Sequence, residues 1–245
     1  MSAAHLAELI RANQPCVVLT GAGVSTESGI PDFRSAGGIW ARYDPMEYAT
    51  IDAFHRDPVK VWDFYSRRFE VLLEAKPNAA HDALAALERA GYVQAVVTQN
   101  VDRLHELAGS QDVVEVHGSI RTSSCLACGR SETFDEVVRL LGTAPAPVCA
   151  TCGSILKPDV VMFGELLPAA AMERATELAQ QAGLLIVVGS SLAVYPVADL
   201  PRMTIDAGGT LAVVNRERTP FDAAAAVAIH AAAGETLAAV LAELL

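Results

Sequence analysis

The chain has 245 residues, enough for one sizeable hydrophobic core with a smaller appended region. Acidic residues outnumber basic ones, 29 against 18, so the formal net charge is -11. This charge disfavours nonspecific binding to nucleic acid and attracts cationic peptide segments, so we expect no direct nucleic-acid partner. No apolar run has the length of a membrane span, and the first residues, MSAAHLAELI, lack a signal-peptide pattern. We therefore expect a soluble, cytoplasmic protein without a membrane partner.

Strand-like and helical patterns alternate along the chain. After a short helical pattern near the N-terminus, apolar strand-like runs occupy residues 16–20, 93–98, 113–116, 184–188, 211–214 and 227–229. Helical periodicity occupies residues 58–73, 81–90, 169–182 and 235–245. The alternation predicts an α/β fold, a Rossmann-like parallel sheet with helices on both faces.

Two stretches interrupt this alternation and predict a second, smaller domain. About seventy residues separate the first two strands, far more than one crossover helix needs. We expect residues 1–34, 75–118 and 158–245 to form the Rossmann-like domain. A helical insertion at 35–74 and a cysteine-containing insertion at 119–157 then form the small domain. The ligand site is expected in the cleft between the two domains, at the carboxyl ends of the strands.

A glycine-rich segment follows the first strand-like run. Residues 21–35 read GAGVSTESGIPDFRS, with GAG directly after the strand. Glycines there let a backbone pass close to a phosphate, and a helix beginning near Ser25 directs its free N–H groups at an anion. The segment continues through an acid, an aromatic and a base at 32–34. This combination predicts a loop that binds a whole cofactor, including its reactive end.

Four of the five cysteines form two CxxC pairs, Cys125/Cys128 and Cys149/Cys152. This spacing is typical of a tetrahedral zinc site with four thiolate ligands. Four protein ligands leave no position for an activated water, so the predicted zinc is structural and stabilises an insertion too small for its own core. A redox pair and a nucleic-acid-binding ribbon are the alternatives; the second is disfavoured because the insertion has few basic residues.

Polar side chains follow the predicted strands at their carboxyl ends. The sequences are TQNVD at 98–102, EVHG at 115–118, GSS at 189–191 and NRE at 215–217. An open α/β sheet binds its ligand at these ends, so we interpret the four clusters together as a site. His117 is expected to act there as a general base at neutral pH, although a lone histidine is more often structural.

The motifs GAGVSTESGIPDFRS, TQNVDRLHELAG, His117-Gly118, the two CxxC pairs, KPDVVMFGE at 157–165 and GSSLAVYPVA at 189–198 resemble those of the sirtuins. Sirtuins are NAD-dependent protein-lysine deacylases, and the resemblance covers nearly the whole chain in collinear order. It implies that NAD is a co-substrate contacted by Gly21, Ala22, Gly23, Ile30, Asp32, Phe33, Arg34, Gln99, Asn100, Asp102, Gly189, Ser190, Ser191, Asn215, Glu217 and Ala233.

The resemblance also implies a mechanism in which NAD is consumed. The acyl oxygen of the substrate attacks the ribose carbon and expels nicotinamide, while Phe33 shields the cleaved bond from water. His117 acts as general base toward the ribose hydroxyls and, with Asn100, is assigned as catalytic. Water then releases lysine and O-acyl-ADP-ribose. Without the resemblance, the residues alone favour a helix or turn cap for Asp32 and a core aromatic for Phe33.

Acyl-lysine proteins or peptides are the partners that the resemblance implies. An extended peptide would pair with the backbone of residues 160–165 and 192–195. Tyr65 and Arg68 lie three residues apart on a predicted helix and resemble the pair that binds acidic acyl tails in the desuccinylase and demalonylase branch. The substrate residues that the resemblance implies are Ala36, Tyr65, Arg68, Val160, Phe163, Gly164, Val194 and Tyr195.

Other features resemble bacterial or archaeal deacetylases instead, namely Asp32, Arg103 and the GSS sequence at 189–191. The alternative for Tyr65 and Arg68 is an exposed helix face, with Arg67 and Arg68 solvated or paired to Asp63 or Glu70. The leading prediction is a deacylase that removes succinyl or malonyl as well as acetyl groups. Protein mono-ADP-ribosyl transfer is the alternative predicted activity. A dehydrogenase and a non-enzymatic zinc-ribbon module are further alternatives; GAGVST lacks the third glycine of a dinucleotide-binding fingerprint.

Overall fold

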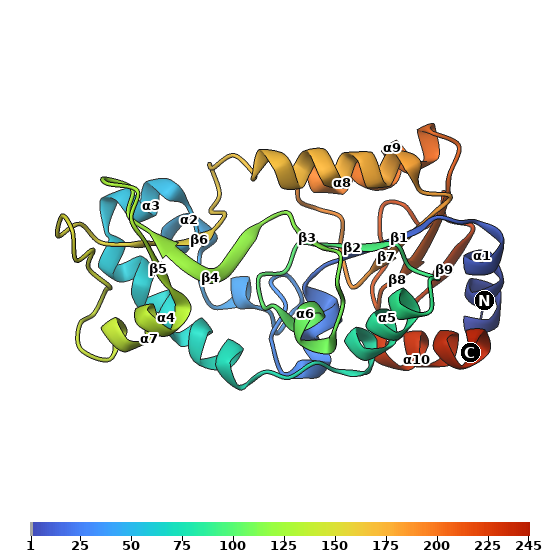
Figure 1. The fold of residues 1–245 in the computed structure, drawn as a ribbon, viewed down its shortest axis with the longest axis horizontal. Coiled ribbons are helices and arrows are strands. Elements are labelled where there is room, and N and C mark those ends of the chain that lie inside the picture. Colours follow the sequence, from blue (N-terminus) through green and yellow to red (C-terminus); the bar gives the residue numbers. More distant parts are fainter. Residues whose placement is uncertain (1) are drawn as a thin grey trace. The chain divides into compact units, whose positions relative to one another are not determined.

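The computed structural model describes residues 2–245, and the chain folds into two compact units (Figure 1). The first unit comprises residues up to Pro31, Lys76–Val116 and Pro168–Leu245. The second comprises Asp32–Ala75 and His117–Leu167. Each unit is described separately below.

The first unit is built on a six-stranded parallel sheet in the order β3-β2-β1-β7-β8-β9. The strands are β1 (Cys16–Thr20), β2 (Ala95–Thr98), β3 (Val113–Glu115), β7 (Leu184–Val188), β8 (Thr210–Val214) and β9 (Val227–Ile229). β1 and β7 are buried along their whole length, as expected for a parallel sheet covered on both faces. The strand order reverses at β1, and polar side chains follow the strands there.

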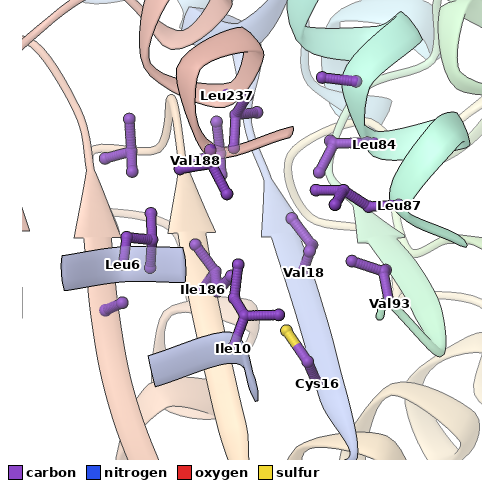
Figure 2. Close-up of a cluster of buried hydrophobic side chains, with 14 of the residues drawn as sticks. Leu6, Ile10, Cys16, Val18, Leu84, Leu87, Val93, Ile186, Val188 and Leu237 are labelled. Carbon is purple, nitrogen blue, oxygen red and sulfur yellow. The ribbon is translucent and has the colours of Figure 1, made fainter. Parts of the chain in front are cut away.

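Helices cover both faces of this sheet (Figure 1). They are α1 (Ala3–Ala12), the 3₁₀ helix η1 (Ala22–Ser28), α5 (Ala79–Arg89), α6 (Leu104–Ala108), α8 (Ala169–Gln181), η3 (Val197–Asp199), α9 (Leu200–Asp206) and α10 (Ala233–Leu244). Figure 2 shows the core on one face, where Leu6 and Ile10 of α1, Leu84 of α5 and Leu237 of α10 pack over alternate strand residues such as Val18. Alternation places the neighbouring strand residues on the face that α8 and α9 cover.

The second unit combines helices with a small antiparallel sheet in the order β5-β4-β6. Its strands are β4 (Gly118–Ser124), β5 (Ser131–Thr133) and β6 (Lys157–Val160). Its helices are η2 (Ile39–Ala41), α2 (Pro45–Tyr48), α3 (Ile51–Arg56), α4 (Pro58–Glu74) and α7 (Phe134–Leu141). Asp57 caps α4 by accepting a hydrogen bond from the backbone of Lys60, and Pro58 occupies the first turn.

The predicted α/β fold, a parallel sheet covered by helices on both faces with a smaller second part, is confirmed, and the small antiparallel sheet is an addition that was not predicted. Residues 32–34, 75, 117–118 and 158–167 were expected in the Rossmann-like domain but belong to the second unit. Residues 158–167 are the longest of these stretches. They lie in the second unit because β6 pairs with β4, at Gly118↔Val160 and Ser124↔Lys157. The helix expected near Ser25 is η1, which begins three residues earlier, at Ala22.

Within residues 2–245, no helix combines the length and the apolar composition needed to cross a lipid bilayer.

Candidate functional site

The glycines after β1 lie against the loop after β7. A Cβ atom at Gly21 would lie 2.9 Å from the carbonyl oxygen of Gly189, and one at Gly23 would lie 2.8 Å from the same oxygen. The backbone of Gly23 also donates a 2.8 Å hydrogen bond to Gly189. The two loops therefore meet backbone to backbone, which only glycine permits at this separation. Packing between the loops, in addition to any phosphate, accounts for these glycines.

Side chains at the ends of β2 and β7 are joined by hydrogen bonds. Gln99 donates to the hydroxyl of Ser190 at 2.9 Å. Asn100, which is buried, donates to the hydroxyl of Ser25 at 3.0 Å and to the carbonyl of Gly21 at 3.3 Å. The structure thus brings together two of the four predicted strand-end clusters and the glycine-rich segment, and it holds Asn100 in one orientation.

Next to Asn100, a buried series of hydrogen bonds leads from Asn78 through His81 and Ser25 to Asp102. Asn78 donates its backbone N–H to Nδ1 of His81 at 3.3 Å, so Nε2 of His81 carries the proton and faces Ser25 at 3.4 Å. Ser25 in turn donates to a carboxylate oxygen of Asp102 at 2.7 Å. Burial raises the pKa of Asp102, although hydrogen bonds from Leu104, Ser25 and Asn100 oppose that shift.

A second buried histidine, His105, lies next to His81 in this hydrogen-bond series. Its ring centroid lies 4.9 Å from that of His81, and its Nε2 lies 2.9 Å from the hydroxyl of Thr20, which donates to Thr98. Burial lowers the pKa of His81 to about 4 and that of His105 to about 3, so both rings are neutral at physiological pH. The sequence analysis missed Ser25, His81 and His105 as parts of the site. The sequence carried no local signal for them, because their burial and their hydrogen bonds depend on the tertiary structure.

The residues predicted to face adenosine lie after β8 and at the start of α10. Asn215 donates its side-chain amide to the carbonyl of Glu217 at 2.8 Å, and its own carbonyl contacts Nδ1 of His230 at 3.0 Å. His230 also pairs with Asp222 at 3.1 Å. Ala233 is 6% exposed, and its methyl group belongs to the hydrophobic core.

The segment after Gly189 is more open. Ser191 is exposed, Val194 is half-buried and Tyr195 is 68% exposed. Leu192 adopts a φ of 52°, and its backbone N–H donates to the hydroxyl of Ser190 at 3.2 Å. Ala22 is half-buried and Ile30 is buried, both in the first unit. The predicted peptide-facing residues of this segment are therefore accessible.

In the second unit, residues 32–40 fold into a compact turn. The carboxylate of Asp32 accepts hydrogen bonds from the backbones of Arg34 and Ser35, at 3.0 and 2.8 Å. Its carbonyl accepts from Ile39 at 2.9 Å. Asp32 thus acts as a turn cap, the alternative left open by the sequence. Arg34 and Ala36 are exposed on this turn.

Arg68 and Phe33 are in contact. The guanidinium carbon of Arg68 lies 4.9 Å from the ring centroid of Phe33 and 5.7 Å from that of Phe64, both cation–π distances. Arg67, the preceding residue, pairs with Asp63 at 3.2 Å. The structure therefore places the predicted acyl-binding arginine against the aromatic residue predicted to shield the cleaved bond.

Tyr65 does not lie on an exposed helix face. It is 6% exposed, and its ring packs against those of Phe64 and Phe69, with centroids 5.3 and 6.4 Å apart. Burial raises its pKa to about 12, with Glu165 raising it and Arg68 lowering it. Tyr65 therefore keeps its hydroxyl proton and remains a hydrogen-bond donor at physiological pH.

Residues 160–166 have their backbone groups only partly satisfied. Val161 donates to the carbonyl of His117 at 2.9 Å, and Phe163 donates to Ala49 at 2.8 Å and accepts from Ile51 at 3.0 Å. Val160 pairs with Gly118 in the sheet. Across residues 2–245, by contrast, the N–H groups of Gly164 and Leu166 make no hydrogen bond. The unpaired N–H groups that an added strand could bond are therefore those of Gly164, inside the expected segment 160–165, and of Leu166, just beyond it.

The four paired cysteines come together as predicted. Their sulfur atoms all lie within 4.8 Å of one another, with Cys125–Cys152 at 3.4 Å and Cys128–Cys149 at 3.6 Å. Tetrahedral zinc with bonds of about 2.3 Å would space its sulfurs by about 3.8 Å, so the donor set fits that ion. The backbone N–H of Ser154 lowers the pKa of Cys152 to about 6, which favours the thiolate form that a metal requires.

Comparison with known proteins gives concordant matches. The model of the Sir2 family matches residues 21–196. The chain is 47% identical over 233 residues to an NAD-dependent protein deacylase 2 of Pyrobaculum aerophilum, covering 95% of this chain and 92% of the relative. It is 44% identical over 215 residues to an NAD-dependent protein deacetylase of Thermotoga maritima, covering 88% and 87%.

Solved structures resemble the chain throughout its length. A structure of a Sir2 protein with a p53 peptide and NAD⁺ has a TM-score of 0.92 at 40% identity, covering 99% of this chain and 98% of that one. A structure of Sir2Tm bound to a propionylated peptide has a TM-score of 0.91 at 40% identity, with the same coverage.

Proposed function

Because this chain belongs to the Sir2 family, we propose that it is an enzyme, an NAD-dependent protein-lysine deacylase. The observation that carries the proposal is the strand-end cluster in which Gly21, Gln99, Asn100 and Ser190 are joined by hydrogen bonds. These residues lie within the part of the chain that the family model matches. NAD is the co-substrate and acyl-lysine peptides are the partners, as in the names and structures of its relatives.

We assign the first unit as the NAD-binding domain and the second as the small domain with the zinc site. NAD supplies a ribose carbon to the acyl oxygen, with nicotinamide as the leaving group. Asn100 is held by Ser25 and by the carbonyl of Gly21, so it presents a fixed amide at the end of β2. His117 accepts a proton from a ribose hydroxyl, and Phe33 excludes water from the cleaved bond. The products are nicotinamide, O-acyl-ADP-ribose and free lysine.

Incubating the protein with NAD and acetyl-, malonyl- or succinyl-lysine versions of one peptide tests this function. Nicotinamide should form with at least one peptide, and the peptide should lose its acyl mass. His117→Ala should lower kcat by about 10²- to 10⁴-fold, because it removes the general base. No nicotinamide from any of the peptides would contradict the proposal. ADP-ribose retained on an acceptor protein would favour mono-ADP-ribosyl transfer, and NADH absorbance would favour a dehydrogenase.

We also propose activity on acidic acyl groups, supported by Tyr65 and Arg68. The buried phenol is a neutral donor and the arginine offers a fork for a carboxylate. Arg68→Met should lower kcat/KM for succinyl-lysine by about 10- to 100-fold, the worth of a charge-assisted hydrogen bond. Tyr65→Phe should have a smaller effect in the same direction.

Turnover of the acetyl peptide is the internal control, because an acetyl group has no carboxylate. Arg67→Met is the matched variant, since Arg67 is exposed on the same helix and pairs with Asp63. It should leave both activities near those of the parent. Equal losses with acetyl and succinyl peptides in Arg68→Met would show that Arg68 serves the packing of Phe33 and not the acyl group.

The cytoplasm is our proposed location. The five cysteines are free thiols, and four of them form the metal-ligand set described above. Thiolate ligands of this kind are suited to a reducing compartment.

A further inference from the structure

Lys157 is a buried lysine at the start of the segment that carries the proposed peptide-docking residues. Its side chain is 7% exposed, and its ammonium group lies near three oxygen atoms. These are the carbonyls of Pro158 and Val160, both at 3.0 Å, and a carboxylate oxygen of Glu165 at 2.9 Å. An ammonium group has three N–H donors, so each donor has an acceptor.

Glu165 closes the other end of the same segment. The oxygen that binds Lys157 also accepts the backbone N–H of Met162 at 2.8 Å. The backbone of Glu165 donates to the carbonyl of Met162 at 3.0 Å. Met162 itself is only 2% exposed. Together these bonds tie β6 to residues 162–165 and make one closed loop of residues 157–165, which we call the clasp.

The clasp leaves the residues at its end available for pairing. Gly164 has a φ of 90° and Leu166 is 95% exposed, and within the described chain their N–H groups are unpaired. An ordered but unpaired backbone binds an added strand more tightly than a mobile one, because its ordering cost is already met.

We propose that the Lys157–Glu165 ion pair is a positioning device that holds residues 164–166 ready to pair with the backbone of an acyl-lysine peptide. This inference rests on the proposed function. Neither side chain is assigned contact with NAD or with the acyl group. The pair therefore affects binding of the peptide and leaves binding of NAD unchanged.

Thermal stability distinguishes this positioning role from a role in stabilising the fold alone. Removing one partner of a buried ion pair leaves an uncompensated charge and lowers stability, whereas replacing both partners with apolar side chains is often neutral. Lys157→Met should therefore lower Tm, and the double variant Lys157→Met/Glu165→Met should recover most of that loss. The double variant still lacks the clasp, so its peptide binding should remain weak.

Steady-state kinetics on an acetyl-lysine peptide test the inference. KM for the peptide should rise about tenfold in Lys157→Met and in the double variant, the factor expected when about one residue must be ordered on binding. KM for NAD should stay within about twofold of the parent value. Lys60→Met is the matched control, because Lys60 forms an exposed ion pair with Glu47 in the same unit. It should leave both constants unchanged.

Hydrogen exchange of residues 161–167 is a readout that needs no turnover. Lys157 accepts no amide hydrogen bond, so faster exchange of this segment in Lys157→Met reports loss of order and supports the clasp. Unchanged exchange would overturn the inference, as would a double variant with the parent's KM for the peptide, or equal rises in both KM values. If the parent forms no nicotinamide from any acyl-lysine peptide, the proposed function fails, and the exchange rates alone then decide whether the ion pair orders residues 164–166.

Discussion

Lowering the pH from about 8 to about 4.5 is expected to reduce the free energy of unfolding by about 5 kcal/mol through His81 and His105 alone. Burial lowers their pKa values to about 4 and about 3 in the folded protein. In the unfolded chain a histidine has a pKa of about 6.5. Below that pH the unfolded chain binds more protons than the folded one, so stability falls as the pH falls.

Each pKa unit corresponds to about 1.4 kcal/mol, so each histidine contributes a loss of about 2 to 3 kcal/mol by pH 4.5. The sum is comparable to the whole stability of many domains, about 5–15 kcal/mol. The loss ends near the folded pKa values, about 4 for His81 and about 3 for His105. Asp102 acts in the opposite sense, because its raised pKa means that the folded protein takes up its proton at a higher pH than the unfolded chain.

Urea unfolding measured from pH 8 to pH 4.5 checks this expectation. His105→Gln keeps an N–H group near Thr20 and removes one titrating ring, so it should roughly halve the pH-dependent loss. His55→Gln is the control, because His55 is exposed and should leave the pH dependence as it is. An unchanged pH dependence in His105→Gln would contradict the assignment to buried neutral histidines.

Loss of the metal is expected to unfold the cysteine-bearing part of the second unit. The buried cluster there consists of Cys125, Cys149 and Leu156, with Leu140 packed against it, which is too little apolar surface for independent stability. Structural zinc contributes about 10–16 kcal/mol of apparent binding free energy in small zinc-dependent folds. The four sulfur atoms already lie at the spacing of a zinc ligand set.

Cys152→Ser should therefore reduce zinc from about one equivalent per chain to near none and lower Tm by many degrees. Metal analysis, together with limited proteolysis between residues 119 and 157, provides the measurement. Cys16→Ala is the matched control, because Cys16 is a buried thiol of β1, whose pKa is raised to about 12 by burial, and it is no ligand. Full zinc content and an unchanged Tm in Cys152→Ser would show that the quartet does not hold the ion.

Local patterns were sufficient for most of the fold. The runs at 16–20, 184–188 and 227–229 became β1, β7 and β9 with the expected ends, because continuous β-branched and aliphatic runs suit a sheet buried on both faces. In the second unit, the helix predicted at 58–73 became α4, whereas the strands and the shorter helices were not predicted. β4 reads GSIRTSS, which has little apolar alternation, and it forms through pairing with β5 and β6.

The candidate site, like the fold, could be predicted from the sequence only in part. Residue type and spacing identified the cysteine quartet, because metal ligands must be particular residues at short separations. Spacing also suggested that Tyr65 and Arg68 share a helix face, but only packing revealed that the tyrosine is buried and that Arg68 lies on Phe33. No local pattern connects His81 to Ser25 across 56 positions in the chain.

The sequence by itself therefore determined the class of fold, the family and the metal site, since these depend on periodicity and on motifs whose spacing is local. Tertiary structure alone decided which groups are buried, which backbone N–H groups remain unpaired at Gly164 and Leu166, and how Lys157 and Glu165 close the segment before them. Burial and hydrogen-bond partners depend on residues brought together from distant parts of the chain, and these set the pKa values and the accessible edges.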